Sequence, residues 1–137
     1  MPFSNDTVVA ALRKLVATRV PGSSGGFVIF SANDREYVQF SLEPAGLMLF
    51  WPAEGPAVPA RDPRVTDLLR ELSFHEVELR SKSDRPSTLN YRAYVKLSDG
   101  LYGQFGDDIE LTERFTTMAF ERVFGHLTAT LSSQIEV

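Results

Sequence analysis

The sequence contains no cysteine, which excludes disulfide bonds and any metal or iron–sulfur site built on thiolates. It contains only two histidines, His75 and His126, and no further histidine stands near either at ligand spacing. No apolar run approaches the roughly 20 residues that a membrane-spanning helix requires. The first residues also lack the basic region and continuous apolar stretch of a secretory signal. We therefore expect a cytoplasmic protein that binds no metal and contacts no membrane.

The net charge of the chain is also small. The formal net charge is −4 and the isoelectric point is about 5.2. This mild acidity argues against a general basic field for nucleic acid, so we expect no nucleic-acid partner. The 137 residues, 43% of them apolar, match one ordinary domain and are enough to bury a core. We predict a single domain over residues 1–137.

Motifs for catalysis are missing as well. No serine stands in a Gly-x-Ser-x-Gly turn, and the glycine-rich run GSSGG at 22–26 lacks the lysine of a phosphate-binding loop. The acidic group lacks the spacing of a calcium loop, and helix capping explains it without any chemistry. This group consists of Asp107, Asp108, Glu110 and Glu113. We therefore predict no enzyme activity, no catalytic residue and no cofactor.

The first half of the chain predicts one helix followed by three strands. Apolar residues recur at helical spacing up to the Pro21-Gly22 turn, which predicts a helix over 5–19. Three short runs rich in β-branched and aromatic residues predict strands at 27–32, 36–43 and 46–51. Since tight turns join these strands, we expect an antiparallel meander.

A proline-rich stretch opens the second half. Its four prolines between 52 and 63 are unsuited to a sheet ladder or a helix interior, so we expect a surface connection. Asp62 can cap a helix whose first residue is Pro63. The apolar stripe of this helix consists of Val65, Leu68, Leu69 and Leu72.

Two alternating runs, 74–81 and 88–97, predict a second hairpin. In the second run we expect one apolar face with Leu89, Tyr91, Ala93, Val95 and Leu97, and one polar face with Asn90, Arg92, Tyr94 and Lys96. The following run, LYGQFG at 101–106, is rich in glycine and is interpreted as a short extension.

A third helix is predicted after Asp107-Asp108, whose carboxylates suit a helix N-terminus. Gly125 closes this helix. The tail, residues 126–137, fits either a last strand or a continued helix. Thr128 and Thr130 favour the strand, because β-branched residues are common there.

The resulting order is α-β-β-β-α-β-β-α, with the additional strand option at the C-terminus. Antiparallel runs of strands separated by single helices are typical of an α+β domain. We expect an antiparallel sheet with the helices packed on one face.

This order resembles the type III secretion chaperone-like fold and its bacterial relatives, the YbjN-like and TY-Chap groups. The run EYVQF at 36–40, followed by a bulky third strand and a leucine-rich helix, is similar to what these groups carry. The resemblance covers residues 5 to 124. The proline-rich loop at 52–63 and the tail at 126–137 depart from the simplest pattern. The resemblance implies a homodimer that binds protein segments and does not catalyse a reaction.

The first strand, 27–32, and the third strand, 46–51, are apolar on both faces. In the first strand, Phe27 and Ile29 alternate with Val28 and Phe30. In the third strand the pattern is the same. Leu47, Leu49 and Trp51 alternate with Met48 and Phe50. Helices can cover one face, but a sheet of this kind normally presents a polar second face to water. Exposing such side chains would forgo about 1.5–3 kcal/mol each. We therefore expect a protein partner, a second copy or the C-terminal tail to cover the second face.

These observations predict a non-catalytic protein-binding module that acts as a homodimer. The candidate partner-binding residues are Tyr37, Gln39, Met48, Phe50, Trp51, Arg92 and Tyr94. One alternative is a small-molecule sensor or enzyme with a pocket between sheet and helices. Another is an immunity or inhibitor protein that binds a toxin.

Overall fold

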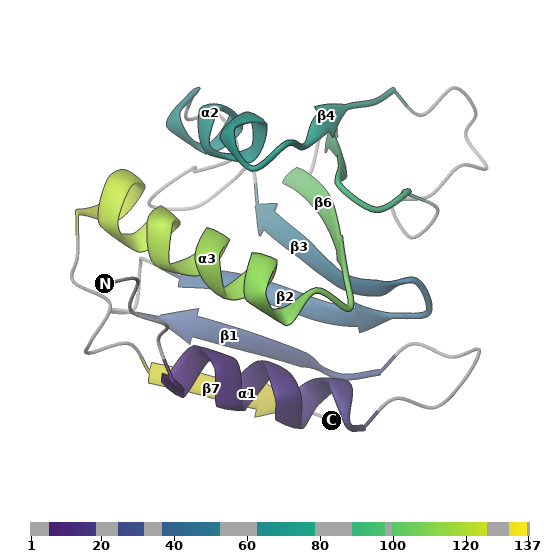
Figure 1. Ribbon diagram of the computed structural model, residues 1–137, viewed down its shortest axis with the longest axis vertical. Coiled ribbons are helices and arrows are strands. Elements are labelled where there is room, and N and C mark those ends of the chain that lie inside the picture. Colours follow the sequence, from purple (N-terminus) through teal and green to yellow (C-terminus); the bar gives the residue numbers. More distant parts are fainter. Residues whose placement is uncertain are drawn as a thin grey trace.

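The chain forms a layer of helices on one side of a seven-stranded mixed sheet (Figure 1). The computed structural model describes residues 6–18, 25–31, 37–52, 63–78, 89–97, 100–125 and 132–136. The helices are α1 (Asp6–Val16), α2 (Pro63–Glu71) and α3 (Ile109–Ala119), which continues into the π-helical turn η3 (Phe120–Phe124). The strands are β1 (Phe27–Ser31), β2 (Tyr37–Glu43), β3 (Gly46–Pro52), β4 (His75–Glu76), β5 (Ala93–Leu97), β6 (Gly100–Gly106) and β7 (Ser132–Glu136).

The sheet order is β4-β5-β6-β3-β2-β1-β7. The predicted meander of the first three strands is confirmed, because β1 pairs with β2 and β2 pairs with β3 in antiparallel register. Residues 132–136 of the tail form a strand, since β7 pairs antiparallel with β1 at one edge of the sheet. The α+β class is confirmed, and the sheet is mostly antiparallel.

The predicted hairpin of 74–81 with 88–97 is wrong. His75 pairs with Ala93 in parallel register, and the Val77 amide donates a hydrogen bond to the Tyr94 carbonyl at 2.9 Å. Only two residues of the first run enter the strand β4. Alternation reports that a run is extended with two unlike faces, but it does not report the direction in which the run pairs.

The glycine-rich run interpreted as an extension is in fact β6, which lies between β3 and β5 in the middle of the sheet. Its glycines weaken the alternation that identifies a strand. One of them, Gly106, has a φ of 62° at an irregularity where β3 and β6 change register. The prediction therefore missed a strand, and the segment between α2 and α3 contains three strands instead of two.

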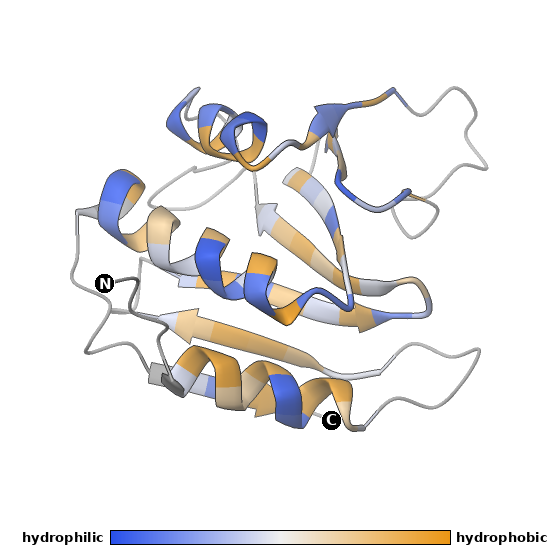
Figure 2. Cartoon of the chain, viewed as in Figure 1, coloured by the Kyte–Doolittle hydropathy of each residue, from blue (hydrophilic) through white to orange (hydrophobic). Residues whose placement is uncertain are grey.

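Helix signals in the sequence are confirmed where the structure describes them. The Asp108 side chain caps α3 and accepts a hydrogen bond from the Leu111 amide at 3.0 Å. Gly125 ends η3 in the left-handed region, with a φ of 74°. The stripe predicted for α2 is buried, and Figure 2 shows the hydrophilic residues of α2 on its outer side. The predicted cap at Asp62 lies outside the described residues.

The main core fills the space between the helices and the sheet. Phe40, Phe105 and Phe115 form a group of edge-to-face ring contacts with centroid distances of 5.2–6.3 Å. Trp51 packs against Phe115 in the same way, at 6.1 Å. Such contacts are favourable beyond the apolar area that they bury. Among the described residues, no helix has the length and apolar character to cross a bilayer.

Candidate functional site

The face of the sheet opposite the helices carries a continuous row of side chains. Strand register places Ile29 opposite Gln39, Gln39 opposite Phe50, and Phe50 opposite Tyr102. All four are partly exposed, whereas their neighbours along the strands, such as Val28 and Leu49, are buried against the helices. We call Ile29, Gln39, Phe50 and Tyr102 the open row.

The open row is apolar and aromatic at its centre. The rings of Phe50 and Tyr102 lie 4.9 Å apart between centroids. Further partly exposed residues on the same face flank the row at Phe27 and Tyr37. None of these six residues is charged, and the charged residues of this face, Glu43 and Glu136, stand at the ends of β2 and β7.

The other half of this face is covered by the chain itself. Met48, Leu89, Ala93 and Val95 form a second buried cluster, separate from the main core, and Val77 packs against it. Val77 and Leu89 belong to the two ends of the connection from β4 to β5, so both ends of that connection contact the second face. Met48, predicted for partner binding, is therefore only 3% exposed.

The segment before β5 is anchored by Tyr91 and Arg92. The Tyr91 hydroxyl donates a hydrogen bond to Asp108 Oδ2 at 2.6 Å. The Arg92 guanidinium lies 5.3 Å from the centre of the Tyr91 ring and donates a hydrogen bond to the Leu72 carbonyl just beyond the end of α2. Arg92 also has a φ of 64°, in the left-handed region. The structure thus gives Arg92, a predicted partner-binding residue, a position in the fold as a helix cap.

The electrostatics of this anchor centre on Asp108. Burial alone would raise the pKa of its carboxyl group. Hydrogen bonds from the Tyr91 hydroxyl and the Leu111 amide, together with the charges of Arg92 and Arg114, outweigh burial and lower the pKa of Asp108 below its ordinary value. Asp108 is therefore an ionised cap and anchor, and its arrangement does not suit a general acid.

Gln104, on β6, contacts the segment before β5 and is 1% exposed. Its Oε1 accepts a hydrogen bond from the Gly106 amide at 2.8 Å, across the register change in β6. Its backbone carbonyl accepts a hydrogen bond from the Arg92 amide at 2.9 Å. Within the described part of the chain, Gln104 Nε2 has no partner. Gln104 thus satisfies a backbone donor that the irregular ladder leaves unpaired.

Two other predicted partner-binding residues face the helices. Trp51 is 1% exposed and Tyr94 is 0% exposed, and both belong to the main core. The expected polar face of the run 88–97 was wrong for Tyr94, because the first three residues of β5 are all buried, whereas Lys96 is exposed as expected. Burial raises the pKa of Tyr94, and its hydroxyl donates a hydrogen bond to Glu76 Oε1 at 3.2 Å.

Tyr37, Gln39 and Phe50 are the predicted residues that the structure leaves partly exposed on the second face. The prediction missed Ile29 and Tyr102. The two-sided apolar character of 27–30 could have identified Ile29. Tyr102 lies in the glycine-rich run that was not recognised as a strand.

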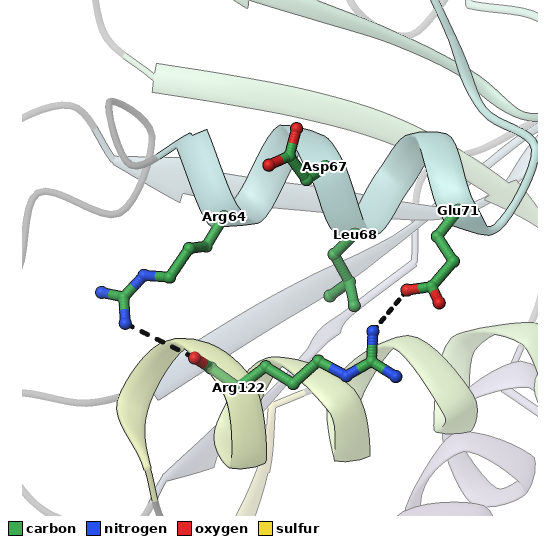
Figure 3. A pocket seen from close by; sticks show the side chains of 5 residues that line it. All are labelled: Arg64, Asp67, Leu68, Glu71 and Arg122. Carbon is green, nitrogen blue, oxygen red and sulfur yellow. Dashed lines mark hydrogen bonds and ion pairs between the residues drawn. The ribbon is translucent and has the colours of Figure 1, made fainter.

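A hollow of about 360 Å³ lies elsewhere, between α2 and η3 (Figure 3). It is lined by Arg64, Asp67, Leu68, Glu71 and Arg122. Arg122 forms an ion pair with Glu71, and Arg64 Nη1 donates a hydrogen bond to the Arg122 carbonyl at 3.5 Å. Asp67 points away from η3 (Figure 3). Because Arg122 is paired with Glu71 and Asp67 is directed away, the charged groups that line this hollow do not converge on its interior.

Within the described ranges, no group of three or more histidine, aspartate or glutamate residues is arranged to hold a metal ion. No protein-family model matches this chain, and searches among curated proteins and solved structures find no significant similarity.

Proposed function

We propose that this chain is a non-catalytic, cytoplasmic protein-binding module that acts as a homodimer and holds a protein partner or segment. The observation that carries the proposal is the uncharged, aromatic open row on the second face of the sheet. Aromatic residues are enriched, and charged residues depleted, at the centres of protein interfaces. The resemblance to the secretion chaperone-like fold points to the same function, but the observed order has a third strand between α2 and α3, so the open row carries the proposal.

Energetics favour the open row as a contact surface. Burying apolar surface contributes about 25 cal/mol per Å², and covering Ile29, Phe50 and Tyr102 would remove their remaining exposed area from water. The row is also preorganised, because each residue stands on a strand of a paired sheet. Preorganisation reduces the entropy lost on binding.

A small-molecule pocket between sheet and helices has less support. In the described part of the chain, that space holds fully buried side chains, including Phe40, Phe105 and Phe115. An immunity or inhibitor protein would use the same kind of face against a toxin, and this alternative is a special case of the proposed function.

The test is affinity capture with three forms of the chain. Phe50→Glu introduces a charge in the open row, and Ala10→Glu introduces the same charge at an exposed position of α1, in the helix layer. We expect the wild type and Ala10→Glu to retain the same proteins from the host lysate or added free chain, and Phe50→Glu to lose them. Equal retention by all three, or no retention by the wild type, would contradict the proposal. Circular dichroism melts would show that all three forms fold.

A further inference from the structure

The segment Leu89–Tyr91 lies on the second face of the sheet, beside the open row. Leu89 is 5% exposed and belongs to the second buried cluster together with Met48. Tyr102 of the open row packs against the same cluster. The covered half of this face is therefore continuous with the open row, and moving Leu89 away would enlarge the exposed apolar surface without a change in the sheet.

Tyr91 attaches this segment to the fold through an exposed side chain. The residue is 47% exposed, and its hydroxyl donates a hydrogen bond to Asp108 Oδ2 at 2.6 Å. Its ring lies close to Gly106, since a Cβ atom there would be 2.8 Å from the ring. A hydrogen bond that is open to solvent is weaker than a buried one, because water competes for both groups. This attachment is therefore easily released.

Arg92 provides a fixed end about which the segment can turn. Its backbone amide donates a hydrogen bond to the Gln104 carbonyl at 2.9 Å, and its guanidinium donates one to the Leu72 carbonyl. The Ala93 amide donates to the Asn90 carbonyl at 2.9 Å, which makes a turn at this point. Openings of a few residues at such a place leave the rest of the fold intact.

The side chain of Gln104 favours an open position of the segment. Gln104 is the register partner of Met48 and lies two residues after Tyr102 on β6, so it belongs to the covered half. It is 1% exposed, and its Nε2 has no hydrogen-bond partner within the described ranges. A buried amide donor without a partner is costly, and the cost is removed when the donor meets water or an acceptor.

We propose that Leu89–Tyr91 is a releasable cover, and that its opening adds the covered half of the face to the open row. The inference rests on the proposed function and concerns the regulation of the same surface. In the open position a protein segment contacts Met48 beside Phe50, and Gln104 Nε2 donates a hydrogen bond to a carbonyl of that segment. In the closed position a partner must compete with Leu89 for this part of the surface.

The absence of cysteine allows the opening to be measured by thiol labelling with an aromatic disulfide. Met48→Cys places a single thiol under the cover, and Leu49→Cys places one at the next residue, which is 0% exposed and belongs to the main core. Each is made alone and together with Tyr91→Phe, which removes the hydrogen bond to Asp108 and keeps the ring. We expect Tyr91→Phe to raise the labelling rate of Met48→Cys by about tenfold and to leave that of Leu49→Cys unchanged.

Each outcome decides the inference. Acceleration confined to Met48→Cys supports the cover. Equal acceleration of both thiols overturns it, because the whole chain would then be opening, and an unchanged rate for Met48→Cys overturns it because Tyr91 would not hold the segment. Amide hydrogen exchange of Tyr91→Phe without either thiol repeats the comparison, with faster exchange expected at Ala93 and none in β3. These measurements need no partner, so the proposed function fails separately, in the capture experiment with Phe50→Glu.

Discussion

At the residue scale, Asp108 connects its own helix to the segment before β5. One carboxylate oxygen accepts from the Leu111 amide and the other from the Tyr91 hydroxyl. The sequence predicted the capping role, because aspartate before an apolar helical pattern is a local signal. It did not predict Tyr91 as a partner, since that contact joins residues 17 positions apart.

We predict that Asp108→Asn destabilises the protein in a pH-dependent way. Asparagine caps helices about as well as aspartate, so the variant mainly removes the charge, at a cost of about 1 kcal/mol near pH 7. Because folding lowers the pKa of Asp108, its stabilisation is complete above the unfolded pKa of about 3.9 and is lost as the pH falls through the lower folded pKa.

Urea unfolding of wild type and Asp108→Asn between pH 7 and pH 2.5 measures this effect. The difference in unfolding free energy should shrink at the acid end of the series. A difference that is constant over the whole range would show that the charge is not responsible.

A second prediction at this scale concerns Arg92. Arg92→Ala removes the hydrogen bond to the Leu72 carbonyl and keeps a side chain in the left-handed region. Arg92→Gly removes the same hydrogen bond but suits the backbone. We expect both variants to lower the free energy of unfolding, with alanine about 1 kcal/mol worse than glycine. Chemical denaturation of the pair measures the difference, and a more stable alanine variant would contradict the assignment of strain.

At the element scale, the helices were more predictable than the strands. The start of α3 and the end of η3 follow from Asp108 and Gly125, which act on the adjacent backbone. The pairing of β4 with β5 depends on contacts distant in sequence, so alternation in 74–81 and 88–97 left its direction undetermined. The inner strand β6 was missed because its glycines weaken the alternation of apolar and polar residues. The reason for a glycine at 106, its positive φ, is visible only in the folded sheet.

Glycines in β6 give a third prediction. A Cβ atom on Gly106 would lie 2.8 Å from the Tyr91 ring, and the φ of 62° disfavours any other residue. Gly103 lies in the same strand, and a Cβ atom there would meet Phe105 at an ordinary 3.5 Å. We expect Gly106→Ala to lower the free energy of unfolding by about 1–3 kcal/mol and Gly103→Ala to have little effect. Thermal unfolding of both variants provides the comparison, and equal melting temperatures would contradict it.

At the scale of the whole molecule, the second face of the sheet has two differently covered halves. The two-sided apolar character of β3 correctly predicted that this face is not simply polar. What the sequence could not predict is the division: the ends of the connection from β4 to β5 bury Met48 and Val95, while Gln39 and Phe50 remain partly exposed. Parallel strands need a long connection between them, whereas a hairpin needs only a short turn, so the direction of this pairing had to be known first.

The most direct test of the open row is to map self-association residue by residue. Amide NMR spectra of the isotopically labelled chain, recorded at increasing concentrations of unlabelled chain, report which residues enter a contact. We predict concentration-dependent shifts at Ile29, Gln39, Phe50 and Tyr102, with the hollow lined by Arg64 and Arg122 unchanged. Shifts confined to that hollow, or spectra independent of concentration up to about 1 mM, would contradict self-association through the open row.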